Sequence, residues 1–138
     1  MRQSSRVGLM VVFVVCGFAV GQTAIGSTVK VPNVTGSYAV TDHCNTGWCA
    51  TNDYTGTWTI VQKGTKLTGH DNAGNQLTGT ISGATAKWTL RGPTYSFVVK
   101  ATFAATGKSF HGTFVDSRKA SGTTKAARAT RPKVIVLP

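Results

Sequence analysis

Apolar and polar residues alternate with a period of two from Tyr54 onward, which predicts β-strands. One face of these strands carries large apolar residues and glycines, whereas the other carries mostly Thr, Ser, Lys and His. An antiparallel sheet with one buried and one solvated face gives this pattern, while a parallel sheet gives continuous apolar runs. The apolar face comprises Trp58, Ile60, Leu67, Gly69, Leu77, Gly79, Ile81, Ala86, Trp88, Leu90, Tyr95, Phe97, Val99, Ala101, Phe103, Phe110, Gly112 and Phe114.

A short repeat accompanies the alternation, because an apolar residue is followed by Thr-Gly-Thr or Thr-Gly-His at residues 54–57, 67–70 and 77–80. Some of its glycines recur after ten residues, about the length of one short strand and its turn. Turn signals separate the strands, and no stretch predicts a helix. These signals lie at Lys63-Gly64, 71–75, Ser82-Gly83, Gly92-Pro93, Thr106-Gly107 and 116–119.

The fold class follows from these features. The sequence predicts an all-β antiparallel meander of seven or eight strands over residues 36–128. Glycines on the apolar face permit sharp coiling and close packing of large neighbours, which favours a small up-and-down β-barrel. A two-layer β-sandwich is the alternative. We interpret Trp58, Trp88 and Phe97 as core residues rather than as the wall of a pocket, which favours a filled interior over a cavity.

Several of these segments also occur in a known kind of protein. The order Gly-x-Trp at 56–58, Leu-Thr-Gly-Thr at 77–80, a later strand with Trp88 and Phe-x-Gly-x-Phe at 110–114 resembles the avidin and streptavidin type of secreted barrel. It is similar as well to many small secreted bacterial β-domains. The resemblance spans residues 54–128 and implies the barrel fold. No residue of the avidins' biotin site is carried over, because its polar loops do not align with this chain.

The ends of the chain differ from its body. Arg2 and Arg6 precede an apolar run over 7–20 that is too short to span a bilayer but suits a secretory signal. We therefore predict a signal peptide over 1–21, with cleavage possible as late as residue 26, and a secreted or periplasmic protein without a transmembrane segment. A loose leader over 22–35 and a basic and apolar tail over 129–138 flank the barrel domain.

Export determines how the cysteines are interpreted. Cys44 and Cys49 enclose a four-residue loop, and in an oxidising compartment such a pair predicts a disulfide. A zinc site formed by His43, Cys44 and Cys49 is the alternative, but it lacks an evident fourth ligand. We expect neither a metal nor another cofactor.

Charge narrows the possible partners. The chain has 15 Lys and Arg residues against four Asp and no Glu, and its formal charge is +11. The cations look spread along the strands rather than clustered, which predicts weak, salt-sensitive attraction to an anionic envelope polymer. Nucleic acid is not expected as a partner of a secreted barrel.

Enzymatic motifs are missing, since no nucleophile elbow, phosphate loop or paired carboxylates occur. We expect a non-enzymatic module that binds a small molecule or glycan beside the disulfide loop, with Trp48, His43 and Tyr54 as candidate ligand-binding residues. Trp48 either stands exposed or closes one barrel end as a plug. The alternative function is a protein-interaction module, such as an inhibitor or an envelope assembly component. A cavity with polar lining favours the first function, and a filled interior favours the second.

Overall fold

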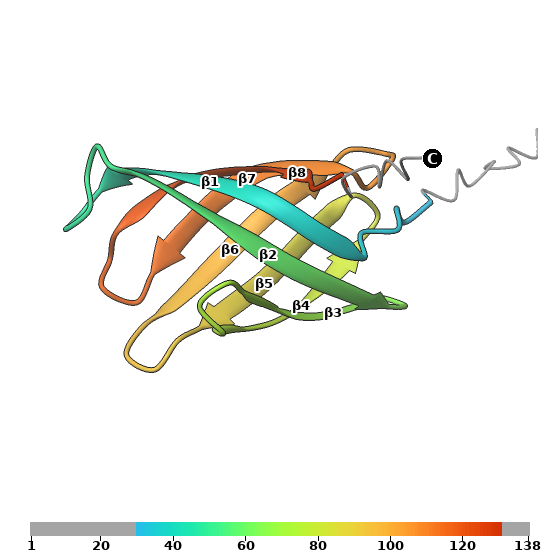
Figure 1. The fold of residues 1–138 in the computed structure, drawn as a ribbon, viewed down its shortest axis with the longest axis horizontal. Coiled ribbons are helices and arrows are strands. Elements are labelled where there is room, and N and C mark those ends of the chain that lie inside the picture. Colours follow the sequence, from blue (N-terminus) through green and yellow to red (C-terminus); the bar gives the residue numbers. More distant parts are fainter. Residues whose placement is uncertain (1–29, 131–138) are drawn as a thin grey trace, which may run out of the picture.

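The protein forms an eight-stranded β-barrel in the computed structural model, which describes residues 30–130 (Figure 1). Every regular element within these residues is a strand, as the alternation predicted. The strands are β1 Gly36–Thr46, β2 Asp53–Lys63, β3 Lys66–Asp71, β4 Gln76–Ser82, β5 Thr85–Arg91, β6 Ser96–Phe103, β7 Ser109–Asp116 and β8 Ser121–Arg128.

The sheet is closed. Each strand pairs antiparallel with the next one along the chain, and β8 pairs antiparallel with β1. The predicted up-and-down meander is therefore confirmed, and the β-sandwich alternative is wrong. Closure leaves no free sheet edge among the described strands, so the backbone polar groups of these strands pair within the molecule.

The inner face of the barrel is packed with aromatic rings over part of its length. The Trp88 side chain is only 1% exposed and meets the ring of Phe110 edge to face, with centroids 5.4 Å apart. Phe110 also stacks on Trp58 at 6.0 Å and contacts Phe103 at 5.1 Å. Such edge and offset contacts add to the stability that burial of the rings provides. This cluster fills the middle of the barrel.

One end of the barrel is closed by a buried polar network. The Tyr38 hydroxyl lies 2.8 Å from the carbonyl of Val34 and 2.6 Å from that of Gly107. The Arg128 Nη2 donates to Tyr38, to Gly107 and to the carbonyl of Asn33. Val34 is fully buried, so this segment before β1 covers the barrel end. Any opening into the interior must therefore lie at the opposite end.

The predicted signal peptide over 1–21 lies outside the described residues, as do the first part of the leader and residues 131–138 of the tail. Among residues 30–130, no helix has the length and apolarity needed to cross a membrane.

Candidate functional site

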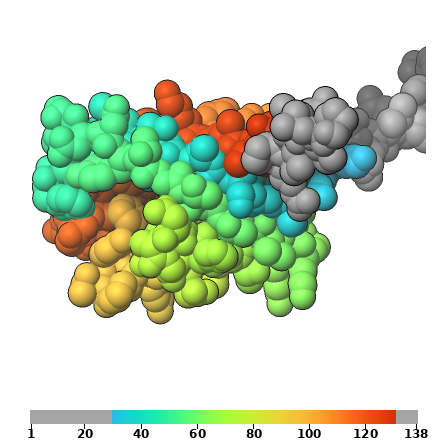
Figure 2. All heavy atoms as spheres, viewed as in Figure 1, coloured from blue at the N-terminus to red at the C-terminus, as the bar shows by residue number. Residues whose placement is uncertain are grey.

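The open end of the barrel holds a cavity of about 410 Å³. It is bounded by the four connections β1–β2, β3–β4, β5–β6 and β7–β8, which gather at the left end of the molecule in Figures 1 and 2. Six rings form most of its wall, and three charged side chains join them. The lining residues are Val40, Asp42, Trp48, Cys49, Tyr54, Thr55, Gly56, Trp58, Asp71, Asn72, Leu90, Tyr95, Phe97, Phe114 and Arg118.

The aromatic wall continues the core toward solvent. Trp58 is 6% exposed and borders the cavity on one side while contacting Trp88 and the rest of the core on the other. Phe97 lies between Tyr95, with centroids 5.2 Å apart, and Phe114, at 5.7 Å. The interpretation of Trp88 as a core residue agrees with its burial, whereas Trp58 and Phe97 both pack on the core and line the cavity. The barrel is thus filled in its middle and hollow at one end.

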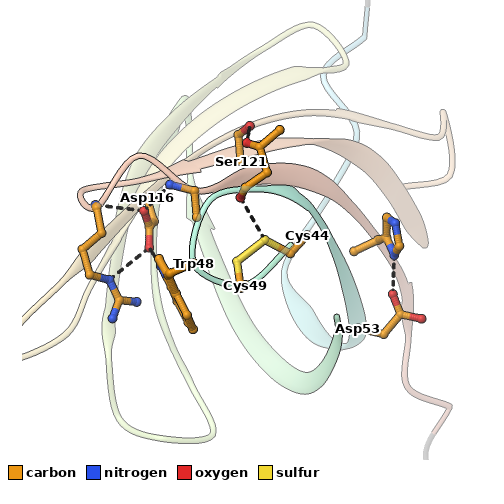
Figure 3. The surroundings of a disulfide bond; sticks show 10 residues. Cys44, Trp48, Cys49, Asp53, Asp116 and Ser121 are labelled. Carbon is orange, nitrogen blue, oxygen red and sulfur yellow. Dashed lines mark hydrogen bonds and ion pairs between the residues drawn. A yellow bond between two sulfur atoms is a disulfide. The ribbon is translucent and has the colours of Figure 1, made fainter. Parts of the chain in front are cut away.

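The predicted disulfide between Cys44 and Cys49 is confirmed, and it shapes the β1–β2 loop. The Cα atoms of the two cysteines are 5.8 Å apart, and the backbone closes the loop through a hydrogen bond from Thr51 N to the Cys44 carbonyl. Because both sulfurs are bonded to each other, they are not thiolate ligands, and the zinc alternative is wrong in this oxidised state. The loop carries Trp48, which lies beside the disulfide and lines the cavity at its rim (Figure 3).

The Trp48 ring is oriented by a hydrogen bond from its indole nitrogen. Its Nε1 donates to Asp116 Oδ2 at 2.9 Å (Figure 3). The Arg118 guanidinium lies 4.1 Å from the ring centroid. The ring nevertheless remains 55% exposed and forms part of the cavity wall. Trp48 is therefore neither a free anchor nor a plug, but an oriented, accessible aromatic surface at the rim.

Asp116 fixes this arrangement. Its side chain is buried, and burial alone would raise its pKa. Hydrogen bonds from Trp48, from the backbone at Ala120 and Arg118, and from the Arg118 side chain outweigh burial and lower that pKa. The carboxylate thus stays charged near neutral pH and keeps both Trp48 and Arg118 at the rim.

Asp42 is a cavity residue that sequence reasoning missed. Its pairing on β1 sets it opposite Tyr54 on β2 and Thr124 on β8, and the side chain lines the cavity. Burial raises the pKa of Asp42 to about 6, and the Thr124 hydroxyl offsets this effect only in part. Neither Asp42 Oδ1 nor Thr124 Oγ1 has a well-aligned hydrogen-bond partner among the described residues. The alternation of Tyr38, Val40 and Asp42 was the signal that could have found it.

This raised pKa leads to a prediction about stability. The folded state binds the Asp42 proton more tightly than the unfolded chain does, so ionised Asp42 destabilises the fold above about pH 6 and this cost disappears as the pH falls toward 4. Asp42→Asn should therefore raise the free energy of unfolding at pH 8 by about 2 kcal/mol and change it little at pH 4. Urea unfolding across this pH range measures the difference.

Asp53→Asn is the matched control, because Asp53 carries the same charge on the outside of the barrel, where it pairs with His43. Its pH profile should follow that of the parent protein more closely. An Asp42→Asn variant that is less stable than the parent at pH 8 would contradict the prediction.

The structure brings together two of the three candidate binding residues. Trp48 and Tyr54 both line the cavity, and their ring centroids are 6.4 Å apart. His43 lies on the outer face, hydrogen-bonded to Asp53 and close to His111 and Lys125 in a second depression of about 410 Å³ that is lined by fewer apolar side chains. In Figure 3 the disulfide separates Trp48 from Asp53. His43 is therefore outside the cavity, because adjacent residues of a strand point to opposite faces.

The surface cations are more ordered than the sequence indicated. Lys66 pairs with Thr80, Thr80 with Lys87, and Lys87 with Lys100, so three lysines share one cross-strand row on the outer face. The interpretation of the cations as spread is wrong for this row. The strands bring together lysines that are far apart in sequence, since register decides which outward residues are neighbours. Within residues 30–130, no group of three His, Cys, Asp or Glu side chains could hold a metal ion.

Comparison with known proteins supports the fold alone. No protein-family model matches the chain, and no curated protein matches it in sequence. Among solved structures, the redesigned β-barrel mFAP1, bound to DFHBI, matches with a TM-score of 0.52 and 17% identity over 69% of this chain and 94% of its own. A fluorescence-activating β-barrel designed de novo matches with a TM-score of 0.37 and 14% identity over 70% of this chain and 94% of its own. The chain is thus similar in fold to a small designed barrel.

Proposed function

We propose that this protein is a non-enzymatic module that binds a small molecule in the cavity beside the Cys44–Cys49 loop. The observation that supports it best is the cavity itself, about 410 Å³ in volume and walled by aromatic rings with a few polar groups. Ligand sites are typically concave, mostly apolar and largely preformed, with a small number of polar groups that fix orientation. A barrel whose only task was stability would fill this end with side chains, as it fills its middle.

Three further observations agree with this proposal. Trp48 is oriented by Asp116 and presents its ring to the cavity, as a preformed binding surface requires. The mFAP1 barrel, similar in fold, is described as bound to DFHBI. The His43 imidazole is hydrogen-bonded to Asp53 on the outer face of the barrel and so leaves the cavity to the aromatic wall.

We propose in addition that the module acts after export, as a secreted or periplasmic protein, because an apolar segment of signal-peptide length precedes the barrel. The mass of the protein recovered from the extracellular or periplasmic fraction tests this. A protein retained in the cytosol with Met1 still present would contradict it.

Binding can be tested through the two tryptophans of the cavity wall. The neutral aromatic probe 1-naphthylmethanol should change the fluorescence of Trp48 and Trp58 and raise the thermal midpoint, because a ligand that binds only the folded state stabilises it by mass action. Biotin, simple sugars and an anionic polysaccharide complete the panel. Absence of any saturable signal across the panel would contradict the proposed function and favour the protein-interaction alternative.

Variants locate the site. Trp48→Ala and Phe97→Ala remove two rings of the wall and should each weaken binding of the probe about tenfold, since each removes roughly 1–2 kcal/mol of apolar contact. Val115→Ala is the matched control, because Val115 is an exposed apolar side chain on the outer face of β7. Equal loss of affinity in the control and in the wall variants would place binding elsewhere on the barrel.

A further inference from the structure

Three carboxyl groups lie in or beside the cavity at the open end. Two of them already accept hydrogen bonds from the protein itself. Asp71 Oδ1 accepts hydrogen bonds from the backbone of Ala73 and Asn75, and its Oδ2 accepts one from the Asn75 side chain at 2.6 Å. Asp116 accepts from Trp48, from Arg118 and from the backbone. Both carboxylates therefore organise the rim and leave little capacity for a ligand.

Asp42 differs from both. Its Oδ1 is buried, and the neighbouring Thr124 hydroxyl offsets the desolvation only in part and does not reach Oδ1 with good hydrogen-bond geometry. No ion pair of the described residues includes it either. A carboxylate in such surroundings carries a large desolvation cost unless a partner compensates it, and native structures rarely keep a buried polar group without one. The same desolvation favours the protonated form of Asp42 and therefore raises its pKa.

Arg118, the one cationic side chain among the described residues that line the cavity, already pairs with Asp116. Arg118 donates through Nε to Asp116, and its guanidinium lies over the rings of Trp48 and Tyr95, at 4.1 and 5.3 Å from their centroids. Arg118 thus forms part of the rim, and its charge is balanced by Asp116. The charge of Asp42 is left without a balancing group among the described residues that line the cavity.

The surroundings of Asp42 define what would complete it. On β2, Tyr54 is its direct register partner. Gly56, paired with Val40, is the next inward position, and a Cβ there would lie 2.9 Å from the Asn72 side chain. Aromatic faces attract cations as well as apolar groups. A carboxylate set in an aromatic wall therefore fits a molecule with a flat apolar body and a positively charged nitrogen.

We infer that the cavity selects small aromatic or apolar molecules that carry a protonated amine, and that the Asp42 carboxylate binds this ammonium group. The inference rests on the proposed function of the same cavity and adds the chemical class of the ligand. A charge-assisted hydrogen bond to the Asp42 carboxylate supplies the counter-charge that the described lining residues do not provide, while the rings hold the body of the ligand. A carboxylate ligand is disfavoured, because Asp42 and Asp71 both face the cavity.

Three probes of one shape test this inference: 1-naphthylmethylamine, 1-naphthylmethanol and 1-naphthoate, which are cationic, neutral and anionic. Calorimetric titration at about pH 7.5 and about 0.15 M salt should give an affinity for the amine at least about tenfold above that for the alcohol, and the weakest binding for the carboxylate. Asp42→Asn keeps the size of the side chain and removes its charge, so it should reduce the amine preference to about threefold or less. Asp53→Asn, which removes a charge from the outer face, should keep the preference.

The outcomes separate the two proposals. If the alcohol and the amine bind equally to the parent protein, or if Asp42→Asn keeps the full amine preference, the inference is wrong while small-molecule binding stands. If none of the three probes binds, the inference is wrong, and the remaining panel of biotin, simple sugars and an anionic polysaccharide decides the proposed function. Because Asp42→Asn is expected to be more stable than the parent protein, loss of its amine preference could not be attributed to unfolding.

Discussion

Replacing Gly112 by valine should destabilise the barrel by about 3 kcal/mol or more, because the inner face has no space for a side chain at this position. A Cβ at Gly112 would lie 2.1 Å from the carbonyl oxygen of Lys100 and 2.7 Å from the Cα of Ala101. Both contacts are with the backbone of β6, which cannot move without breaking its pairing with β7. The sheet would have to open at this point, and urea unfolding followed by tryptophan fluorescence measures the loss.

Thr113→Val provides the comparison for Gly112→Val. Thr113 is the next residue of β7 and faces solvent, so a β-branched apolar replacement of similar size should change stability by less than about 0.5 kcal/mol. If Gly112→Val were as stable as Thr113→Val, close contact between β6 and β7 would not be what closes the barrel.

Replacing Trp88 by alanine is the second change with a large expected effect, a loss of about 3–5 kcal/mol of unfolding free energy. Trp88 is fully buried and touches three aromatic rings, those of Trp58, Phe103 and Phe110. Its removal leaves a void in the filled part of the barrel that the rigid sheet cannot collapse to fill. Thermal and urea unfolding of the oxidised protein measure this loss.

Trp88→Phe separates packing from polarity at this position. The Trp88 Nε1 has no hydrogen-bond partner among the described residues. Replacement by phenylalanine therefore reduces the volume of the buried ring but breaks no hydrogen bond. Its loss should be well below that of Trp88→Ala, and Lys87→Ala on the outer face of β5 should change little. A Trp88→Ala protein within about 1 kcal/mol of the parent would show that the aromatic cluster is not the stabilising core.

These two changes act on the filled part of the barrel, whereas the proposed ligand occupies the hollow end. Protein interiors normally reach the packing density of organic crystals, so a preformed cavity forgoes stability that additional side chains could supply. The ionised Asp42 lowers stability further at neutral pH. Both features have a physical rationale if a ligand fills the space and compensates the charge, as the proposed function requires.

The amino-acid sequence by itself determined the fold class. Alternation with a period of two depends only on which face of a strand each residue occupies, so it predicted the inner residues, the meander and the absence of helices within 30–130. Glycines such as Gly79 and Gly112 indicated tight coiling, because a side chain at these positions would meet the backbone of the next strand. The spacing of Cys44 and Cys49 predicted the disulfide, since the two residues are near neighbours in the chain.

The place of the candidate site could not be predicted from the sequence, because it depends on how the strands are assembled. Alternation gives the face of a residue but not its depth along the barrel axis, which depends on strand register and on how the barrel closes. Trp48 and Asp116 are 68 residues apart and meet only because β7 and β8 return to the β1–β2 loop. The register of β3 to β6 likewise brought Lys66 and Lys100 into one row, since neighbours across a sheet are set by pairing and not by sequence distance. Alternation placed Asp42 on the inner face and His43 on the outer face, but only the assembled barrel showed that a cavity lies beside Asp42.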